Sequence, residues 1–284
     1  MLNRQILNNL ICIKCSGLLN VYDNKLICRE CAKEYQITNN KLFILNEDNN
    51  IESTKNDFIF NEFKKIFKKH HQIFNILYYL FGASFVGKNV GKCINCKDKN
   101  KIIVNLGSGV RMVKDNIINI DFSPYNNVDM VADIANLPFP NNSIDVVVIE
   151  SVLEHVPKHQ AIISEIKRIL KSEGFVYVTV PFVAAFHSSP NDYYRWSKEG
   201  FRELMHDFEE VECGIRHGPT SAMLSIFNEW LATLFSFGSK YLHQFLLILF
   251  TIISSPLKIL DYLISKFPSA QNIAFGFYYI GKKK

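Results

Sequence analysis

The first ten residues, MLNRQILNNL, lack the basic start, the apolar stretch and the small-residue cleavage region of a secretory signal peptide. We therefore expect a cytoplasmic protein in which cysteines stay reduced. Isolated cysteines are also scarce in the sequence, because six of the seven lie in C-x-x-C pairs and only Cys213 stands alone. In a reducing compartment this spacing indicates metal binding rather than disulfides.

Two of these pairs, separated by twelve residues, predict a zinc site made of Cys12, Cys15, Cys28 and Cys31. Four thiolates complete a closed tetrahedral shell, which is the structural kind of zinc site. A module as short as residues 1–46 buries little apolar surface, so the metal should supply much of its folding energy. The third pair, Cys93 and Cys96, has no second pair beside it and is assigned no metal.

The middle of the chain lacks a net positive charge. The whole sequence carries +5, but residues 101–217 carry −5, between flanks of +6 and +4. An acidic central segment argues against a large phosphate-binding surface for nucleic acid. The basic, aromatic-rich flanks suit a negatively charged membrane surface. Ordinary solvated lysine is the alternative for any single charge.

No apolar run reaches the length of an ordinary membrane span. Residues 241–257 contain no Lys, Arg, Asp or Glu, but the run has 17 residues where a spanning helix needs about 20. We predict that residues 218–270 form a helical apolar insertion. It would lie on a membrane surface as a hairpin, re-enter the membrane, or form a homodimer interface, and a true span is the remaining alternative.

What is present is a strand–turn–strand pattern at residues 101–121, KIIVNLGSGVRMVKDNIINID. The β-branched run 102–106 predicts a buried parallel strand. Gly107 and Gly109 let the backbone turn sharply and approach a ligand. A second apolar run ends in Asp121, whose carboxylate can accept hydrogen bonds from both hydroxyls of a ribose.

Further strands are expected at 128–131, 144–149 and 174–180. Asp133 follows the first of these, Glu150 lies at the tip of the second, and Pro181 ends the third. Residues 211–215 and 273–281 complete the pattern. The order predicts an α/β fold with a doubly wound sheet whose polar strand tips share one edge.

These residues resemble the class I S-adenosylmethionine-dependent methyltransferases, in particular the type 11 group. NLGSG stands at the family's glycine motif, and ADIANLPFPNNSIDVVVIESVLEHV matches its adenine-binding acid, fourth strand and following loop. The resemblance implies a Rossmann-like, seven-stranded sheet in a domain of residues 101–284. Gly107, Ser108 and Gly109 would face the methionine end of the cofactor. Asp121 would hold the ribose, and Asp133 and Ile134 would meet the adenine.

Two features depart from the family pattern. Asn105 stands where the family usually has an acidic residue, and we count it among the cofactor-binding candidates. Arg111 occupies the place of a small residue, and eleven residues between Gly109 and Asp121 leave room only for a rudimentary helix. Glu150 is a candidate for orienting the acceptor or the sulfonium.

The first 46 residues resemble the zinc ribbon of the small activator subunit shared by several RNA and protein methyltransferases. The four cysteines of the two knuckles take its ligand positions. Residues 47–100 are predicted to form a polar linker and then an amphipathic helix that caps the cofactor pocket or lies at a membrane with its basic face.

The loop FVAAFHSSPNDYYRW, residues 182–196, carries the acceptor-site candidates His187, Asp192, Tyr193, Arg195 and Trp196. It follows a strand at the edge where open α/β sheets bind ligands. A similar stretch lines the acceptor side in type 11 enzymes of polysaccharide clusters. A lid ordered by an internal Asp–Arg pair is the alternative.

Two absences narrow the chemistry. No cysteine follows the fourth or fifth strand, which excludes covalent pyrimidine methylation. The turn after the fourth strand is Glu-Ser-Val-Leu, not the Asn/Asp-Pro-Pro-aromatic turn that grips an amide or exocyclic amine. Together with the resemblance of the 182–196 loop to type 11 enzymes of polysaccharide clusters and the apolar insertion, these absences lead us to predict O-methylation of a small or lipid-linked glycan-type acceptor, with His155 and His187 as candidate bases beside Glu150. An RNA methyltransferase with a zinc module and a non-catalytic membrane scaffold are the alternatives.

Overall fold

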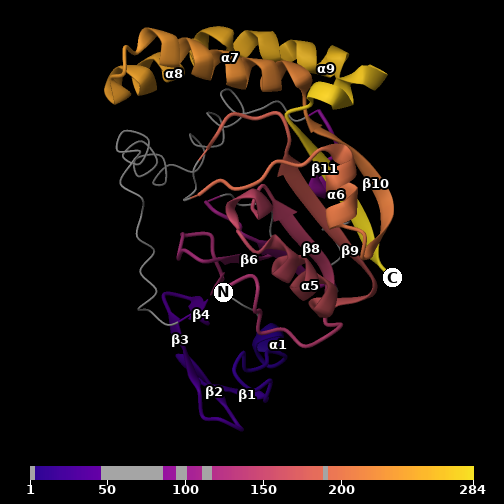
Figure 1. Ribbon diagram of the computed structural model, residues 1–284. Helices are drawn as coiled ribbons and strands as arrows, with labels where there is room; N and C mark the ends of the chain where they lie inside the picture. Colours follow the sequence, from indigo (N-terminus) through magenta and orange to yellow (C-terminus); the bar gives the residue numbers. More distant parts are fainter. Residues whose placement is uncertain (1–3, 46–85, 94–100, 111–116, 188–190) are drawn as a thin grey trace.

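The computed structural model describes residues 4–45, 86–93, 101–110, 117–187 and 191–284 (Figure 1). Within these ranges a mixed sheet runs through the molecule, with a small cysteine-bearing module at one end and a layer of helices at the other. Of the predicted linker and amphipathic helix, only residues 86–93 are described, and residues 111–116 after the glycine bend also lie outside the described ranges.

The predicted doubly wound, seven-stranded sheet is confirmed. Its order is β7-β6-β5-β8-β9-β11-β10, so β5 lies at the point where the strand order reverses. β5 to β9 pair in parallel, and β11 inserts antiparallel between β9 and β10. The strands are β5 (Ile103–Leu106), β6 (Ile117–Asp121), β7 (Met130–Val131), β8 (Ile144–Glu150), β9 (Leu170–Pro181), β10 (Phe208–His217) and β11 (Gly276–Lys283).

Two strands differ in length from the sequence-based expectation. β7 has only two residues, and just before it the carboxylate of Asp129 accepts the backbone N–H of Asn119 at 2.9 Å. β9 begins four residues before Gly174, because Leu170 already pairs with Ile144 across a register shift. Neither difference moves the carboxyl ends of the strands, where the predicted ligand-binding residues lie.

The cysteine-bearing module is not detached from this sheet. It contains α1 (Arg4–Leu7), β1 (Leu19–Val21), β2 (Lys25–Cys28), β3 (Glu34–Thr38) and β4 (Lys41–Phe43). β4 pairs in parallel with β7 and extends the sheet to eleven strands. The ammonium of Lys41 donates to the carbonyls of Tyr125, Asn126 and Val128 at 2.7–3.1 Å. The module therefore braces the loop that follows Asp121.

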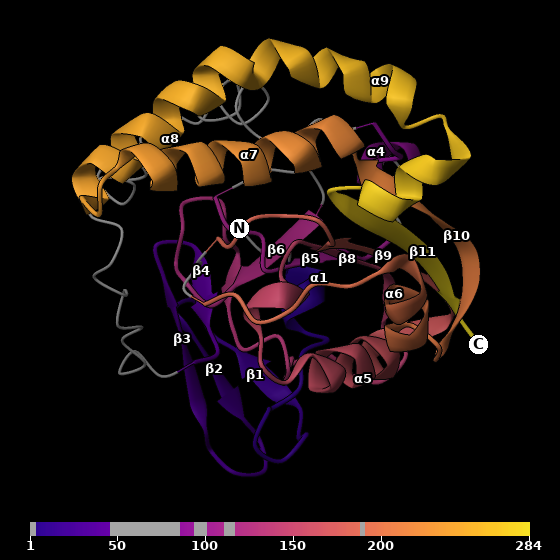
Figure 2. The ribbon, with the colours of Figure 1, turned by 45° about the horizontal axis from the view of Figure 1, so that its top comes forward.

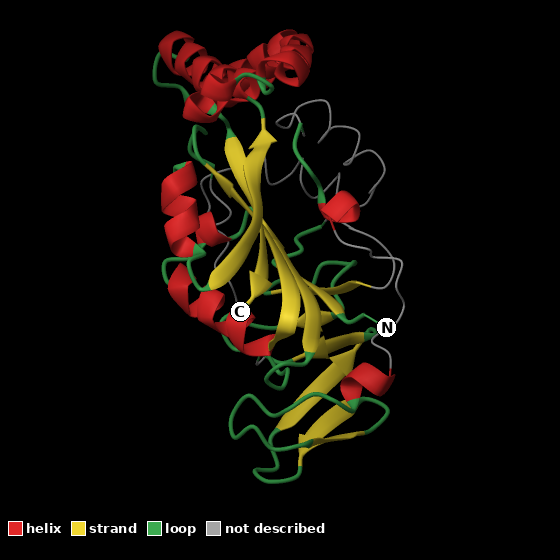
Figure 3. Ribbon diagram, turned by 90° about the vertical axis from the view of Figure 1, so that its right-hand side faces the viewer, coloured by secondary structure: helices red, strands yellow, loops and turns green. Residues whose placement is uncertain are grey.

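Two helices pack on one face of the sheet, α5 (His159–Ile169) and α6 (Lys198–Leu204) (Figure 3). α5 buries one apolar face, formed by Ile162, Ile163, Ile166 and Ile169. α6 begins directly after Ser197, whose hydroxyl caps the helix by accepting the backbone N–H of Gly200 at 3.2 Å. A single-turn helix, η1 (Leu153–His155), follows β8, and α4 (Val90–Cys93) precedes β5.

The predicted apolar insertion forms a helical layer across the end of the sheet (Figure 2). It consists of α7 (Pro219–Phe235), α8 (Lys240–Ser254), η2 (Ser255–Leu260), α9 (Asp261–Ile264) and η3 (Pro268–Ile273). Asp261 is fully buried and accepts the backbone N–H groups of Thr220 and Ser221, which fixes α9 against the start of α7. In the described part of the chain, Lys240–Ile264 is the one helical stretch long and apolar enough to cross a membrane.

Candidate functional site

The glycine bend directly follows β5 and is tied to β6. Gly107 and Gly109 have φ values of +66° and +55°, which side chains with a Cβ rarely adopt. A Cβ on Gly107 would lie 2.5 Å from a methyl group of Val152. The backbone N–H groups of Gly107 and Ser108 donate to the carbonyl of Ile120. The bend is thus held close to the tip of the neighbouring strand.

Asp121 faces this bend, as the sequence predicts. One carboxylate oxygen accepts the N–H of Gly109 at 2.8 Å, and the other accepts the N–H of Ser123 at 2.9 Å. Burial raises the pKa of Asp121, while these backbone hydrogen bonds act in the opposite direction. Each oxygen keeps a second lone pair, so the oriented carboxylate can still accept from the two hydroxyls of a ribose.

Asp133 lies one strand further along the same edge. Asp121 pairs with Val131 on β7, and Asp133 stands two residues beyond it. Its carboxylate accepts the N–H of Ala135 at 2.9 Å, which orders the turn after β7. The half-buried Ile134 packs against the main core. The structure therefore brings the glycine bend and both aspartates to one edge of the sheet.

Two other predicted residues have protein partners. Asn105 is buried in β5 and donates its amide to the Asn119 side chain on β6 at 3.0 Å. Glu150 lies 3.8 Å from the guanidinium of Arg216, which is itself buried in β10. Asn105 thus joins two strands, and Glu150 is one half of a buried ion pair beside the edge.

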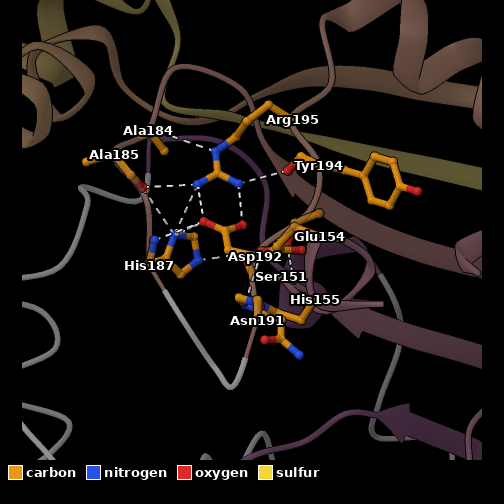
Figure 4. Close-up of polar contacts among 11 residues, drawn as sticks. Ser151, Glu154, His155, Ala184, Ala185, His187, Asn191, Asp192, Tyr194 and Arg195 are labelled. Carbon is orange, nitrogen blue, oxygen red and sulfur yellow. Dashed lines mark hydrogen bonds and ion pairs between the residues drawn. The ribbon is translucent and has the colours of Figure 1, made fainter. Parts of the chain in front are cut away.

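A second polar group forms where the loops after β8 and β9 meet (Figure 4). Glu154 and His155 lie on η1, and His187 lies on the loop after β9. One oxygen of Glu154, Oε1, is 3.9 Å from Nε2 of each histidine. The two imidazole rings meet edge to face, with centroids 5.1 Å apart. We call these three residues the Glu–His cluster.

The sequence-based candidates include both histidines of this cluster but not Glu154. Burial raises the pKa of Glu154 to about 8, and burial lowers the pKa of His155. Among described residues, neither side-chain oxygen of Glu154 has a hydrogen-bond partner. The sequence did show that Glu154 directly precedes His155 after the fourth strand. Whether the Glu154 side chain is buried depends on the tertiary structure.

The Asp192–Arg195 pair that the sequence left as an alternative is present. Arg195 donates to both oxygens of Asp192, at 2.5 and 2.6 Å, and also to the carbonyls of Ala184 and Ala185. Asp192 in turn accepts the N–H of His187 at 2.9 Å. Burial opposes ionisation of Asp192, but the Arg195 bonds hold its pKa below the ordinary value. The fork therefore fixes the backbone that carries His187.

The aromatic candidates divide by exposure. Tyr193 is about half exposed and its N–H donates to the Glu154 carbonyl at 2.7 Å. Trp196 is buried and packs edge to face on His159, together with Tyr194. Tyr193 is available to a ligand in this state, whereas Trp196 anchors the end of the loop.

The four predicted cysteines converge on one point in the cysteine-bearing module. Their sulfur atoms all lie within 4.8 Å of one another, with Cys12–Cys31 at 3.6 Å and Cys15–Cys28 at 3.4 Å. A disulfide needs about 2.05 Å. The edge of a tetrahedron with zinc–sulfur bonds of about 2.3 Å is close to 3.8 Å. The donor set and spacing therefore fit a four-coordinate zinc ion.

The two knuckles share one backbone geometry. Ser16 and Ala32, each directly after a C-x-x-C pair, both have a positive φ, and each N–H donates to the carbonyl of the first cysteine of its pair. The Tyr35 hydroxyl lies 3.1 Å from the Cys12 sulfur. Burial acts against ionisation of Cys12, but this hydroxyl and nearby backbone N–H groups lower its pKa to about 6.

The strand order and glycine bend define the class of protein as Rossmann-like, with the nucleotide edge of a class I methyltransferase. A family model described as a methyltransferase domain matches residues 106–178, about a quarter of the chain. Fold and family match together make this chain an S-adenosylmethionine-dependent methyltransferase. No curated protein matches the sequence.

Solved structures resemble the chain at low identity. The [4+2]-cyclase SpnF is 15% identical, with 76% of this chain and 95% of that chain covered and a TM-score of 0.43. A chain from the complex of the Haloferax volcanii Trm112 methyltransferase activator with a methyltransferase is 15% identical, with 82% and 99% covered and a TM-score of 0.41. Haemonchus contortus phosphoethanolamine N-methyltransferase 2 is 17% identical, with 82% and 58% covered and a TM-score of 0.42. Likeness at this level carries no information about the acceptor.

Proposed function

We propose that the chain transfers a methyl group to a hydroxyl of a small or lipid-linked glycan-type acceptor at a membrane surface. The observation that carries this proposal is the meeting of two loops, after β8 and β9, beside the glycine bend. One loop brings a buried carboxylate and an imidazole, and the other brings a second, half-exposed imidazole. Ligands of open α/β sheets bind outside this edge.

The cofactor would be held by residues whose geometry suits a nucleoside. Gly107 to Gly109 leave backbone atoms open to close approach, Asp121 offers two oriented oxygens, and Asp133 follows on the next strand. S-adenosylmethionine, when bound, supplies an electrophilic methyl group. The protein then has to orient the acceptor in line with that group and exclude water.

A hydroxyl acceptor must lose its proton during transfer. The groups placed to assist are those of the Glu–His cluster, because they lie on the loops that border the cofactor edge. His187 is 44% exposed at its side chain, while Glu154 is fully buried. The acceptor would thus approach from the His187 side, with Tyr193 as an exposed neighbour.

The membrane part of the proposal rests on the helical layer. Large apolar side chains are exposed along both long helices, including Phe227, Trp230, Leu234, Phe245, Ile253 and Phe237 between them. α8 has no buried residue among its described positions. The layer also touches the acceptor loop, because the N–H of Ala185 lies 3.5 Å from the Ser225 hydroxyl on α7. A hairpin lying on lipid would therefore bring a lipid-linked acceptor to this loop.

Zinc is proposed for the four-cysteine cluster, where it would hold the module folded. The four protein ligands leave no open coordination position, so this metal would have a structural role. Because β4 continues the main sheet and Lys41 braces the loop after Asp121, folding of the module would also order the cofactor edge.

The test is to incubate a cell lysate with the full chain and radiolabelled S-adenosylmethionine, and then to separate lipid, glycan, RNA and protein fractions. We expect label in the lipid or glycan fraction, and much less of it with Asp121→Ala when the cofactor is below saturation. Label confined to RNA would contradict the acceptor class. For the membrane part, the full chain should float with anionic vesicles, and Phe245→Asp with Ile253→Asp should reduce flotation.

A further inference from the structure

The carboxylate of Glu154 is fully buried and has no hydrogen-bond donor among the described residues. Burying an unpaired charge is costly, so such a group is normally compensated by a cation or a donor. The side chains that surround Glu154 indicate what would compensate its charge.

Two imidazole nitrogens face this carboxylate. Nε2 of His155 and Nε2 of His187 each lie 3.9 Å from Oε1 of Glu154. The opposite nitrogen of His155, Nδ1, is 2.5 Å from the carbonyl of Asn191. A carbonyl can only accept, so Nδ1 carries the proton and Nε2 presents its lone pair towards Glu154.

His187 is arranged in a similar way. Its Nδ1 lies 3.4 Å from the carbonyl of Ala185 and 3.7 Å from a carboxylate oxygen of Asp192, both of which can accept a hydrogen bond, and 3.5 Å from the Arg195 guanidinium, which can only donate. Histidines that bind metals usually donate their other N–H to a carbonyl or carboxylate, which fixes the tautomer. Both rings of the Glu–His cluster have such partners (Figure 4).

From this geometry we propose that Glu154, His155 and His187 bind one first-row divalent cation. Their candidate ligand atoms lie within 4.8 Å of one another. Ligands about 2.1 Å from an ion stand roughly 3.0–3.4 Å apart, so the three side chains close by less than about 2 Å on binding. The half-exposed His187 ring has room to make this movement.

The donor set selects the class of ion. Two imidazoles and one carboxylate, with open positions, are typical of iron, manganese and catalytic zinc sites. The nearby charges agree, because Asp192 neutralises Arg195 in the bidentate pair, and Glu154 adds one negative charge to the group once it loses its proton to a bound cation. A cation therefore completes the charge balance.

This inference deepens the proposed function and rests on it for its role in the reaction. The cation would bind the acceptor hydroxyl at an open position and lower its pKa, so that the proton passes to water. The oxygen then forms a bond to the methyl carbon as the carbon–sulfur bond breaks, with the electron pair remaining on sulfur. The imidazoles act as ligands in this step.

The test uses the full chain, first loaded with one equivalent of Zn²⁺, and then titrated with Mn²⁺ and followed by electron paramagnetic resonance. Mn²⁺ prefers oxygen and nitrogen ligands to thiolates, so the cysteine cluster does not compete. We expect about one Mn²⁺ per chain, with affinity reduced at least about tenfold in His187→Ala and in Glu154→Gln. The control is His206→Ala, since His206 is an exposed histidine 4.0 Å from Asp207 without a third ligand.

Absence of bound Mn²⁺, or binding that both substitutions leave unchanged, would overturn the inference. His187 is half exposed, so His187→Ala remains informative even if Glu154→Gln fails to fold. S-adenosylmethionine binding is measured on the same samples by calorimetry. If the unaltered chain binds S-adenosylmethionine but no Mn²⁺, only the cation site is refuted, whereas an unaltered chain that binds no cofactor refutes the proposed function.

Discussion

The four-cysteine cluster and the Glu–His cluster contrast in almost every respect. The cysteines lie on two knuckles of the same backbone geometry within twenty residues of sequence, and their sulfurs can surround an ion completely. The Glu–His cluster combines two loops from different strands, with one buried and one half-exposed member. A closed shell stabilises, whereas an open one leaves positions for a substrate.

The comparison also separates what each cluster needs from the rest of the fold. The cysteine spacing is local, so the knuckles need little beyond their own turns. The Glu–His cluster needs the sheet to bring β8 and β9 together, and it needs the Asp192–Arg195 fork to hold the His187 backbone. Four variants test this difference, from the largest expected effect to the smallest.

The largest effect should follow from breaking the closed cluster. Cys12→Ser with Cys28→Ser removes two of four ligands, and structural zinc contributes on the order of 10 kcal/mol in small modules. We expect loss of about one zinc per chain by elemental analysis and a lower thermal unfolding midpoint. Cys213→Ala is the control, since Cys213 lies on β10 outside the cluster. Unchanged zinc content in the double variant would refute the site.

Cofactor binding should depend on Asp121 at the tip of β6, which belongs to neither cluster. Asp121→Ala removes the two oxygens that face the glycine bend. Hydrogen bonds to a charged group contribute about 1.5–3 kcal/mol, so the dissociation constant for S-adenosylmethionine should rise roughly ten- to hundredfold by calorimetry. Asp207→Ala removes a surface ion pair with Lys167 and should leave affinity unchanged. Equal affinity in the two variants would contradict the assignment of Asp121.

The open cluster should be sensitive to the fork behind it. Arg195→Lys keeps the charge but loses the bidentate geometry, so the His187 backbone becomes less fixed. We expect kcat to fall about tenfold, which corresponds to an activation free energy higher by about 1.4 kcal/mol. The thermal midpoint should stay unchanged. Arg202→Lys is a matched control, because Arg202 makes the same two-bond contact with Glu210 on the surface. If both variants lose activity equally, the fork has no special role.

The smallest effect should report on the link between module and sheet. Lys41→Met removes three hydrogen bonds to the loop after Asp121, and we expect a few-fold weaker cofactor binding with zinc content unchanged. Lys25→Met is the control, since the Lys25 ammonium pairs with Glu34 at the surface of the module, away from the loop after Asp121. A Lys41 variant with unaltered affinity would mean that the module does not brace the cofactor edge.

Much of the fold was predictable because its signals are local. Apolar runs that end in Asp121, Asp133 and Glu150 place strand tips on one edge, and Ser197 and the C-x-x-C pairs begin local structures that need no distant partner. The pairing of β4 with β7 was not predictable, because an edge strand accepts any extended neighbour and the two segments are far apart in sequence.

The candidate site was predictable only in part. Sequence reasoning found His155 and His187 but passed over Glu154, since an acid in a loop gives no sign of whether it will be buried. Trp196 was expected at the acceptor side, and the structure packs it against His159. Both differences concern burial, which depends on contacts between segments that are distant along the chain.

The sequence alone determined where most strands lie, the glycine bend with the aspartate at the tip of the next strand, and the four thiols of the module, because each follows from short-range spacing and backbone preference. The tertiary structure decided that the module continues the sheet, that the Glu154 carboxylate is buried with no hydrogen bond from a described residue, and that two histidines from separate loops turn the same nitrogen towards it. These features depend on which segments pack together, and packing joins residues that no local pattern connects.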